Sequence, residues 1–176
     1  MKYWRDFKKY NAAFKFIEEN KPKVIVEYGS GGSTYYLYKC LEELDYGGKL
    51  ITYENNNEWY NKIIEDFPFL KDTVKLVDIE TVDPVKGILR YNHDLNDIKE
   101  VELVILDGPD YRLFLTEQNK PSNVTTNLED IVNYIGKEIP YFIDGREGCV
   151  RYYNNLNYTK HIIQPLEDTG NGNKLL

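Results

Sequence analysis

The sequence predicts an α/β fold, a layered sandwich of helices around a mostly parallel sheet. Short apolar runs of strand length alternate with longer segments of helical periodicity through most of the chain. The runs are continuously apolar, which is typical of strands that are buried on both faces. The length of 176 residues fits a single domain, 1–176. Within it we expect an N-terminal helix, a core and C-terminal strands, at 1–20, 24–150 and 158–176.

The first elements are indicated by periodicity and by a proline. Residues 3–20 carry apolar side chains at spacings of three and four, which predicts an amphipathic helix. The helix ends before Pro22, because the residue that precedes a proline avoids the α region. A buried strand follows at 24–26, and a glycine-rich turn leads from it to a helix that begins near Ser33.

The middle of the chain predicts two more strands and an irregular insert. The strands are expected at 49–53 and 74–79, and Asn57 can cap the helix between them. Residues 80–100 show no clear element, because a proline and a glycine interrupt any long helix there. A short helix is expected at 94–99.

The second half repeats the alternation of buried strands and helices. Strands are expected at 103–106 and 141–143, and helices at 128–135 and 147–156. The segments 158–164 and 174–176 follow as a pair of strands. The last two segments would form a C-terminal antiparallel strand pair around the glycine- and asparagine-rich turn 169–173.

Composition narrows the classes of partner. Lys and Arg total 22 against 29 Asp and Glu, so the net charge of −7 disfavours nucleic acid and anionic membranes as partners. No apolar run approaches the ~18 residues of a membrane-spanning helix, and residues 1–10 lack the apolar core of a signal peptide. Cys40 and Cys149 are expected to be reduced thiols in a cytoplasmic protein.

Polar side chains gather where the predicted strands end. They are found in the turn 27–34 and at Glu54, Asp78 and Asp107. In parallel sheets the carboxyl ends of the strands form the ligand-binding edge, so these side chains are expected to share one site. The turn lacks the third glycine of a dinucleotide-binding loop, since position 34 is Thr, and it lacks the lysine of a P-loop.

Residues 24–33, Val-Ile-Val-Glu-Tyr-Gly-Ser-Gly-Gly-Ser, resemble the first motif of class I S-adenosylmethionine-dependent methyltransferases. The resemblance extends to about residue 150 and implies a Rossmann-like three-layer fold with S-adenosylmethionine as cofactor. It implies that Glu27 faces the amino group of the cofactor's methionine part, directly or through water, which suits a carboxylate. It also implies cofactor contacts from the loop and the helix start, at Gly29, Ser30, Gly31, Ser33 and Thr34.

The later strand ends resemble further motifs of the same family. Glu54 is placed to accept hydrogen bonds from the ribose hydroxyls, and Asn55 is placed to border the adenine pocket. The resemblance implies an adenine contact from the Asp78 side chain and the backbone of Ile79. Trp59 is expected in the core.

Three residues are candidates for the chemistry. Asp107 precedes Gly-Pro at the end of the most apolar strand, and Asp144 ends the neighbouring one, so both are expected at one rim. His93, in the irregular insert, is a candidate base at the pocket mouth. Two carboxylates indicate a divalent metal or general-base catalysis, and Arg146 can neutralise one of them. The Asp-Asn pair of metal-dependent family members is absent, so we expect a metal-free site.

The sequence therefore predicts a methyltransferase that acts on an oxygen or nitrogen of a small molecule or glycan. Acceptor recognition would come from 1–20, 80–98 and 110–127, or from the second subunit of a homodimer. One alternative is a non-catalytic methyltransferase-like module that binds cofactor or a protein partner. Another is a different nucleoside- or dinucleotide-binding α/β protein, which Thr34 disfavours.

Overall fold

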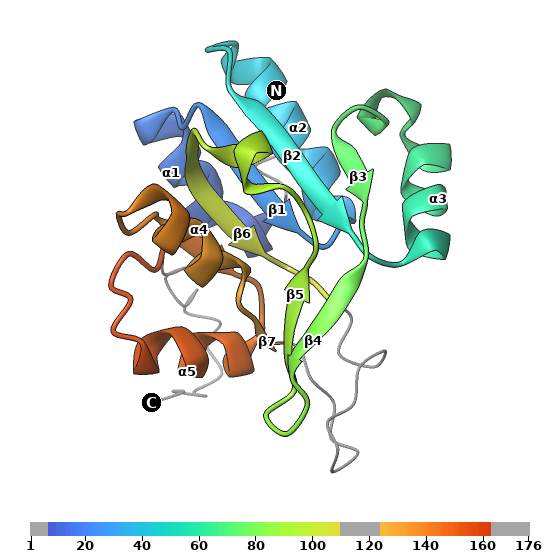
Figure 1. Ribbon diagram of the computed structural model, residues 1–176. Helices are drawn as coiled ribbons and strands as arrows, with labels where there is room; N and C mark the ends of the chain where they lie inside the picture. Colours follow the sequence, from blue (N-terminus) through green and yellow to red (C-terminus); the bar gives the residue numbers. More distant parts are fainter. Residues whose placement is uncertain (1–6, 110–123, 163–176) are drawn as a thin grey trace, which may run out of the picture.

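The computed structural model describes residues 7–109 and 124–162 and contains the predicted parallel sheet (Figure 1). Its five strands have the order β3-β2-β1-β6-β8, and every neighbouring pair is parallel. These strands are Val24–Tyr28 (β1), Lys49–Glu54 (β2), Val74–Leu76 (β3), Val101–Leu106 (β6) and Tyr141–Ile143 (β8). All five residues of β1 are buried, which explains its continuously apolar start.

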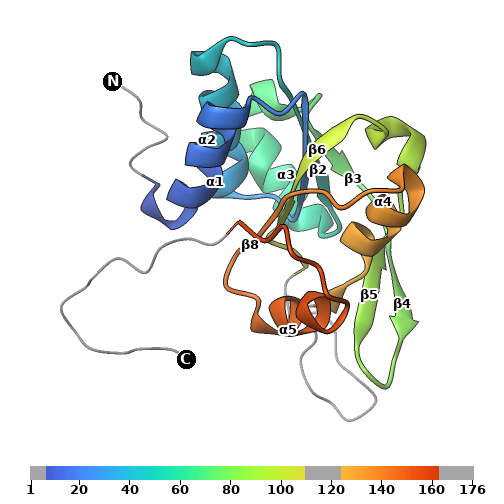
Figure 2. The same ribbon diagram turned by 90° about the vertical axis from the view of Figure 1, so that its left-hand side faces the viewer.

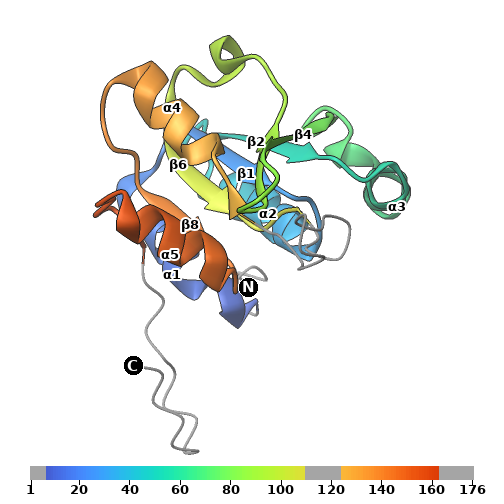
Figure 3. The same cartoon turned by 60° about the horizontal axis from the view of Figure 1, so that its bottom comes forward.

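Helices cover both faces of this sheet. They are Asn11–Asn20 (α1), Gly32–Leu44 (α2), Asn57–Asp66 (α3), Asn127–Ile135 (α4) and Glu147–Asn155 (α5). Short 3-10 turns lie at Lys8–Tyr10 (η2), Pro68–Leu70 (η3) and Leu95–Ile98 (η4). Figure 2 shows α1 and α2 on one side of the sheet and α4 on the other. Figure 3 shows α3 at the β2–β3 side of the molecule, away from α4 and α5. The layout is Rossmann-like, as expected.

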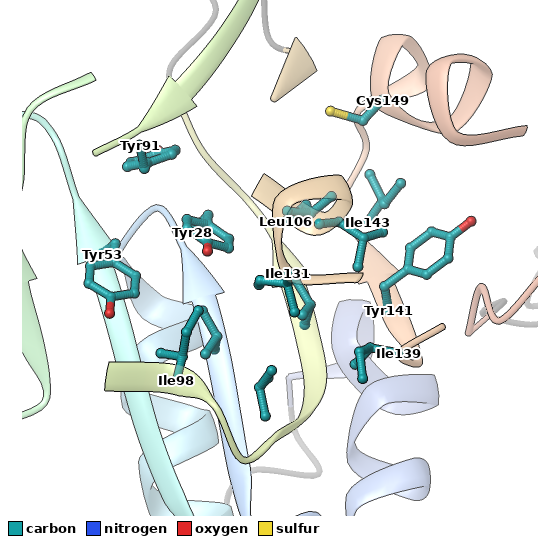
Figure 4. Packing of buried hydrophobic residues seen from close by; sticks show 14 of the residues in the cluster. Tyr28, Tyr53, Tyr91, Ile98, Leu106, Ile131, Ile139, Tyr141, Ile143 and Cys149 are labelled. Atoms are coloured by element: carbon teal, nitrogen blue, oxygen red, sulfur yellow. The ribbon is translucent and has the colours of Figure 1, made fainter. Parts of the chain in front are cut away.

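The two faces of the sheet bury separate apolar clusters. Against α1 and α2, the side chains of Phe14, Ile17 and Leu37 pack on Ile25 and Leu103. The opposite cluster is rich in tyrosine: the ring of Tyr28 lies 5.7 Å from that of Tyr53 and 5.2 Å from that of Tyr91 (Figure 4). These large rings fill the space between the sheet and the insert that follows β3.

That insert folds in a way the sequence pattern did not indicate. The predicted third strand, 74–79, is shorter: β3 ends at Leu76, and Ile79 begins a different strand. Strands Ile79–Asp83 (β4) and Ile88–Tyr91 (β5) form an antiparallel hairpin, and Val124–Thr125 (β7) joins β5 in a second sheet of order β4-β5-β7. The hairpin extends past the carboxyl ends of the main strands (Figure 1).

The structure describes only parts of the elements that were predicted at the two ends of the chain. Residues 3–6 of the expected N-terminal helix lie outside the described residues, and so does 174–176, one strand of the expected C-terminal pair. Within the other expected strand, 158–164, of which 158–162 are described, His161 makes an isolated parallel bridge to Tyr141. The antiparallel pair therefore remains a prediction. Among the helices of the described residues, none has both the length and the apolar character that crossing a bilayer requires.

The cap of α3 differs from the expected one by one residue. Asn56, not Asn57, is the cap: its side-chain oxygen accepts hydrogen bonds from the backbone amides of Glu58 at 2.9 Å and Trp59 at 3.1 Å. Asn57 is already the first helical residue and is exposed. We expect Asn56→Ala to lower the free energy of unfolding by about 1 kcal/mol in a urea titration. Asn57→Ala is the control, and an equal loss from it would contradict this assignment.

Candidate functional site

A cavity of about 430 Å³ opens at the carboxyl ends of β1, β2, β6 and β8. Its volume is in the range of small-molecule sites. The strand order reverses between β1 and β6, which is where ligands bind in sheets of this kind. The predicted site residues on its wall are Gly29, Ser30, Gly31, Ser33, Glu54, Asn55, Asp107 and Asp144.

Two loops meet at the base of this cavity. Gly29, with φ +91°, has a left-handed backbone, and a Cβ built on it would lie 2.6 Å from the Cα of Gly108. The residue must therefore be glycine, both for its backbone angle and for the close approach of the second loop. In contrast, a Cβ on Gly32 would meet no heavy atom within 4 Å. The glycines thus bring the ends of β1 and β6 together and leave open space at the start of α2.

Glu27 does not reach the cavity. Its side chain is fully buried, and its two carboxyl oxygens accept hydrogen bonds from the hydroxyls of Ser33 at 2.6 Å, Thr34 at 2.7 Å and Thr52 at 2.8 Å. Burial raises its pKa to about 8, although these hydroxyls oppose the rise. The carboxyl therefore holds a proton to a higher pH than an ordinary glutamic acid. Thr34 belongs to the same buried network and is likewise absent from the cavity wall.

This buried acid predicts an unusual dependence of stability on pH. An acid whose pKa rises on folding holds its proton in the native state, so its contribution to stability is complete below about pH 4.5 and is lost as the pH rises toward 8. We expect Glu27→Gln, which carries no ionisable proton, to lose less stability than wild type between pH 5 and 8. Urea titrations across this range measure the difference. The exposed Glu65→Gln is the control, and parallel curves for wild type and Glu27→Gln would contradict the assignment.

Glu54 holds the loops at the other end of the cavity. Its Oε2 accepts hydrogen bonds from the backbone amide of Ser30 at 2.8 Å and from the Ser30 hydroxyl at 2.9 Å. Its Oε1 accepts from the amides of Asn55 and Asn56, both at 2.8 Å. The side chain is only 4% exposed. Glu54 therefore joins the glycine-rich loop to the loop that follows β2, and both loops border the cavity.

Asp107 and Asp144 share one rim, as the sequence predicted. Oδ2 of Asp107 accepts a hydrogen bond from the Tyr10 hydroxyl at 2.8 Å and a longer one from the Ser33 hydroxyl at 3.3 Å. Burial and the nearby carboxyl of Asp144 raise the pKa of Asp107 to about 7, and Arg146 opposes the rise. This carboxyl thus holds a proton to a higher pH than an ordinary aspartic acid.

Basic residues border the same rim. Lys9 forms an ion pair with Asp144. The guanidinium of Arg146 donates to the backbone oxygens of Pro109, at 2.6 Å, and of Asp107, and one of its nitrogens lies 3.8 Å from Oδ1 of Asp107. Arg146 thus lies beside Asp107, and its charge opposes the rise in the pKa of that carboxyl. Lys9 was not predicted, because its segment appeared only as a helix with an apolar face.

Other wall residues were also missed or misplaced by sequence reasoning. Trp59, expected in the core, is 46% exposed, borders the cavity, and donates from its indole nitrogen to the Ser30 backbone oxygen. Tyr91 borders the cavity from β5, and its hydroxyl has no hydrogen-bond partner among the described residues. Phe7 lies on the wall as well. Trp59 is the third residue of α3, and its backbone amide donates to the cap residue Asn56.

Three predicted site residues lie elsewhere. The ring of His93 stacks on Tyr53 with centroids 4.0 Å apart, and its Nε2 lies 2.7 Å from the Tyr28 hydroxyl. Burial lowers the pKa of His93, and it does not border the cavity. Asp78 is exposed, and Ile79 packs against the tyrosine-rich cluster; neither is on the cavity wall. Asp78 and Ile79 lie where the chain enters the β4–β5 hairpin, and His93 follows the hairpin.

Within the described residues, no group of three or more His, Cys, Asp or Glu side chains is placed to hold a metal ion. The carboxylates of the rim instead contact hydroxyl and basic groups of the chain. Comparison with known proteins gives no match to a family model and none to a curated protein.

Proposed function

We propose that this protein binds S-adenosylmethionine and transfers its methyl group to a small molecule or glycan. The observation that carries the proposal is the cavity at the point where the strand order reverses, whose wall combines the glycine-rich loop, Glu54 and Asp107. The resemblance of residues 24–33 to a methyltransferase motif supports the same assignment. The glycine-rich loop, Glu54 and Asp107 come from distant parts of the sequence, yet all of them border the same cavity.

The wall suits the parts of such a cofactor. Gly32 leaves open space at the start of α2, so a ribose and its adenine can lie along the loop and Glu54, with Asn55 and Trp59 beside them. The amino-acid part would then extend toward Asp107. Carboxylates accept hydrogen bonds from hydroxyls and pair with ammonium groups, which are the polar groups at the two ends of the molecule.

The proposed chemistry asks the chain mainly to position two reactants. When bound, the sulfonium group supplies an electrophilic methyl, and the enzyme holds an acceptor oxygen or nitrogen in line with it. Asp144, on the same rim as Asp107, is placed to take up the acceptor's proton. Lys9 and Arg146 balance the negative charge of this rim.

Calorimetry with S-adenosylmethionine and S-adenosylhomocysteine tests the cofactor, and release of S-adenosylhomocysteine in the presence of candidate acceptors tests the transfer. Binding of both compounds is expected. If the folded protein binds neither compound, the proposed function is wrong. Small amines, phenols and glycans form the acceptor panel, because the net charge of −7 disfavours nucleic acid.

The hydrogen bonds that Glu54 already accepts constrain ribose binding, and the alternative to an enzyme is a non-catalytic module. The four hydrogen bonds that Glu54 accepts from its own chain fill the acceptor positions of its two oxygens. A ribose hydroxyl can bind only if the Ser30 hydroxyl turns away or shares its place. Under this alternative the module binds cofactor or a protein partner without turnover. Cofactor binding with no methyl transfer to any acceptor in the panel would support it.

A further inference from the structure

We infer that Asp107, and not Glu27, is the carboxylate that holds the ammonium group of the ligand's amino-acid part. The inference rests on the proposed function and refines it. It reverses the role that the sequence resemblance gives to Glu27 and places this acid behind the binding surface as a support for Ser33. Asp107 becomes the residue that distinguishes a nucleoside with an amino-acid chain from one without it.

Glu27 is unsuited to an incoming cation for geometric reasons. Its side chain is fully buried and is not on the cavity wall. Both of its carboxyl oxygens already accept hydroxyl hydrogens, from Ser33, Thr34 and Thr52. An ammonium group could reach it only by displacing Ser33, whose hydroxyl lies between Glu27 and Asp107 with oxygen–oxygen distances of 2.6 and 3.3 Å.

Asp107 has the access that Glu27 lacks. It lies on the cavity wall, and its side chain is 27% exposed. The hydrogen bonds from Tyr10 and Ser33 both go to Oδ2. Beside Asp107 lie the guanidinium of Arg146, with a nitrogen 3.8 Å from Oδ1, and the carboxyl of Asp144. A ligand ammonium can therefore approach Oδ1, while Tyr10 and Ser33 fix the carboxyl group from behind.

The charges around Asp107 predict a proton coupled to this binding. The groups that face it are Tyr10 from η2, Glu27 from β1, Arg146 before α5 and Asp144 after β8. Asp144 in turn forms an ion pair with Lys9. Burial and Asp144 raise the pKa of Asp107 to about 7, so near neutral pH the carboxyl is partly protonated. A bound ammonium keeps its own proton and displaces this one into the buffer. Affinity is therefore expected to fall as the pH drops below about 7.

Two ligands and two variants test the inference. S-adenosylhomocysteine carries the amino acid, whereas 5′-methylthioadenosine has the same nucleoside thioether without it. We expect Asp107→Asn to weaken binding of S-adenosylhomocysteine by about 10-fold or more, since a hydrogen bond to a charged group is lost, and to change binding of methylthioadenosine less than about 2-fold. Glu27→Gln, the matched control, should leave the ratio of the two dissociation constants as in wild type.

The opposite pattern, with selective loss in Glu27→Gln and none in Asp107→Asn, overturns the inference. If wild type binds methylthioadenosine and S-adenosylhomocysteine equally well, the site recognises no ammonium and the inference is wrong while nucleoside binding stands. If neither ligand binds, the proposed function itself fails. If a variant does not fold, calorimetry of wild type at pH 7 in buffers of different ionisation enthalpy measures the proton release directly. We expect S-adenosylhomocysteine to release a proton on binding and methylthioadenosine to release none. Equal proton release with the two ligands overturns the inference.

Discussion

The Glu54→Ala protein is expected to bind S-adenosylhomocysteine roughly 100-fold more weakly than wild type, as measured by calorimetry. The carboxylate is the proposed acceptor for the ribose hydroxyls, and it also anchors the cavity wall. Without it, the backbone amides of Ser30, Asn55 and Asn56 lose their shared acceptor. The two loops then lose their common position, so both the ligand contact and the shape of the site are lost.

Glu58→Ala is the matched control for this substitution. Glu58 lies four residues further along, in the first turn of α3, and its side chain is exposed and away from the cavity. Its removal should change ligand affinity less than about 2-fold and stability by a few tenths of a kcal/mol. Wild-type affinity in a folded Glu54→Ala protein would contradict the cofactor assignment, because no other acidic side chain is proposed for the ribose.

The Gly29→Ala protein is expected to lose roughly 3 kcal/mol of unfolding free energy in a urea titration followed by circular dichroism. Two costs add at this position. A side chain at φ +91° is strained, and its Cβ would lie 2.6 Å from the Cα of Gly108, in backbone that cannot move independently. The loops after β1 and β6 would have to separate, which also opens the base of the cavity.

Two other glycines separate these costs. Gly47 has φ +80° and open space around its Cα, so Gly47→Ala measures the strain alone and should cost about 1 kcal/mol. Gly32 has neither a left-handed backbone nor a close neighbour, so Gly32→Ala should leave stability within about 0.5 kcal/mol of wild type. A Gly29→Ala loss no larger than that of Gly47→Ala would show that the approach of Gly108 does not matter.

Most of the main sheet was predictable because β1, β6 and β8 are buried along nearly their whole length. A continuously apolar run such as 103–106 has few alternatives in a soluble chain, and β6 covers it. The shared location of the acidic strand ends was also predictable, because parallel strands place their carboxyl ends at one edge of the sheet. Asp107, Asp144 and Glu54 thus meet at the cavity, as expected from sequence order alone.

The insert after β3 was not predictable in this way. Residues 79–91 have mixed polarity, and three of the five side chains of β4 are exposed, so neither the strand period nor the helix period is clear. The hairpin forms because β5 can pair with β7 and pack Tyr91 against Tyr28, contacts between residues far apart in sequence. His93 follows β5 into this packing, and a histidine expected in a loop becomes a half-buried ring against two tyrosines.

The sequence by itself determined the layered architecture, the glycine-rich turn after the first strand and the set of carboxylates at one edge of the sheet. Only the tertiary structure decided which of these carboxylates faces the cavity. Because β1 is buried on both faces, its apolar pattern carries no information about the direction in which Glu27 points. The hydroxyls of Ser33, Thr34 and Thr52 enclose that acid, and the neighbouring strand brings Asp107 to the open side.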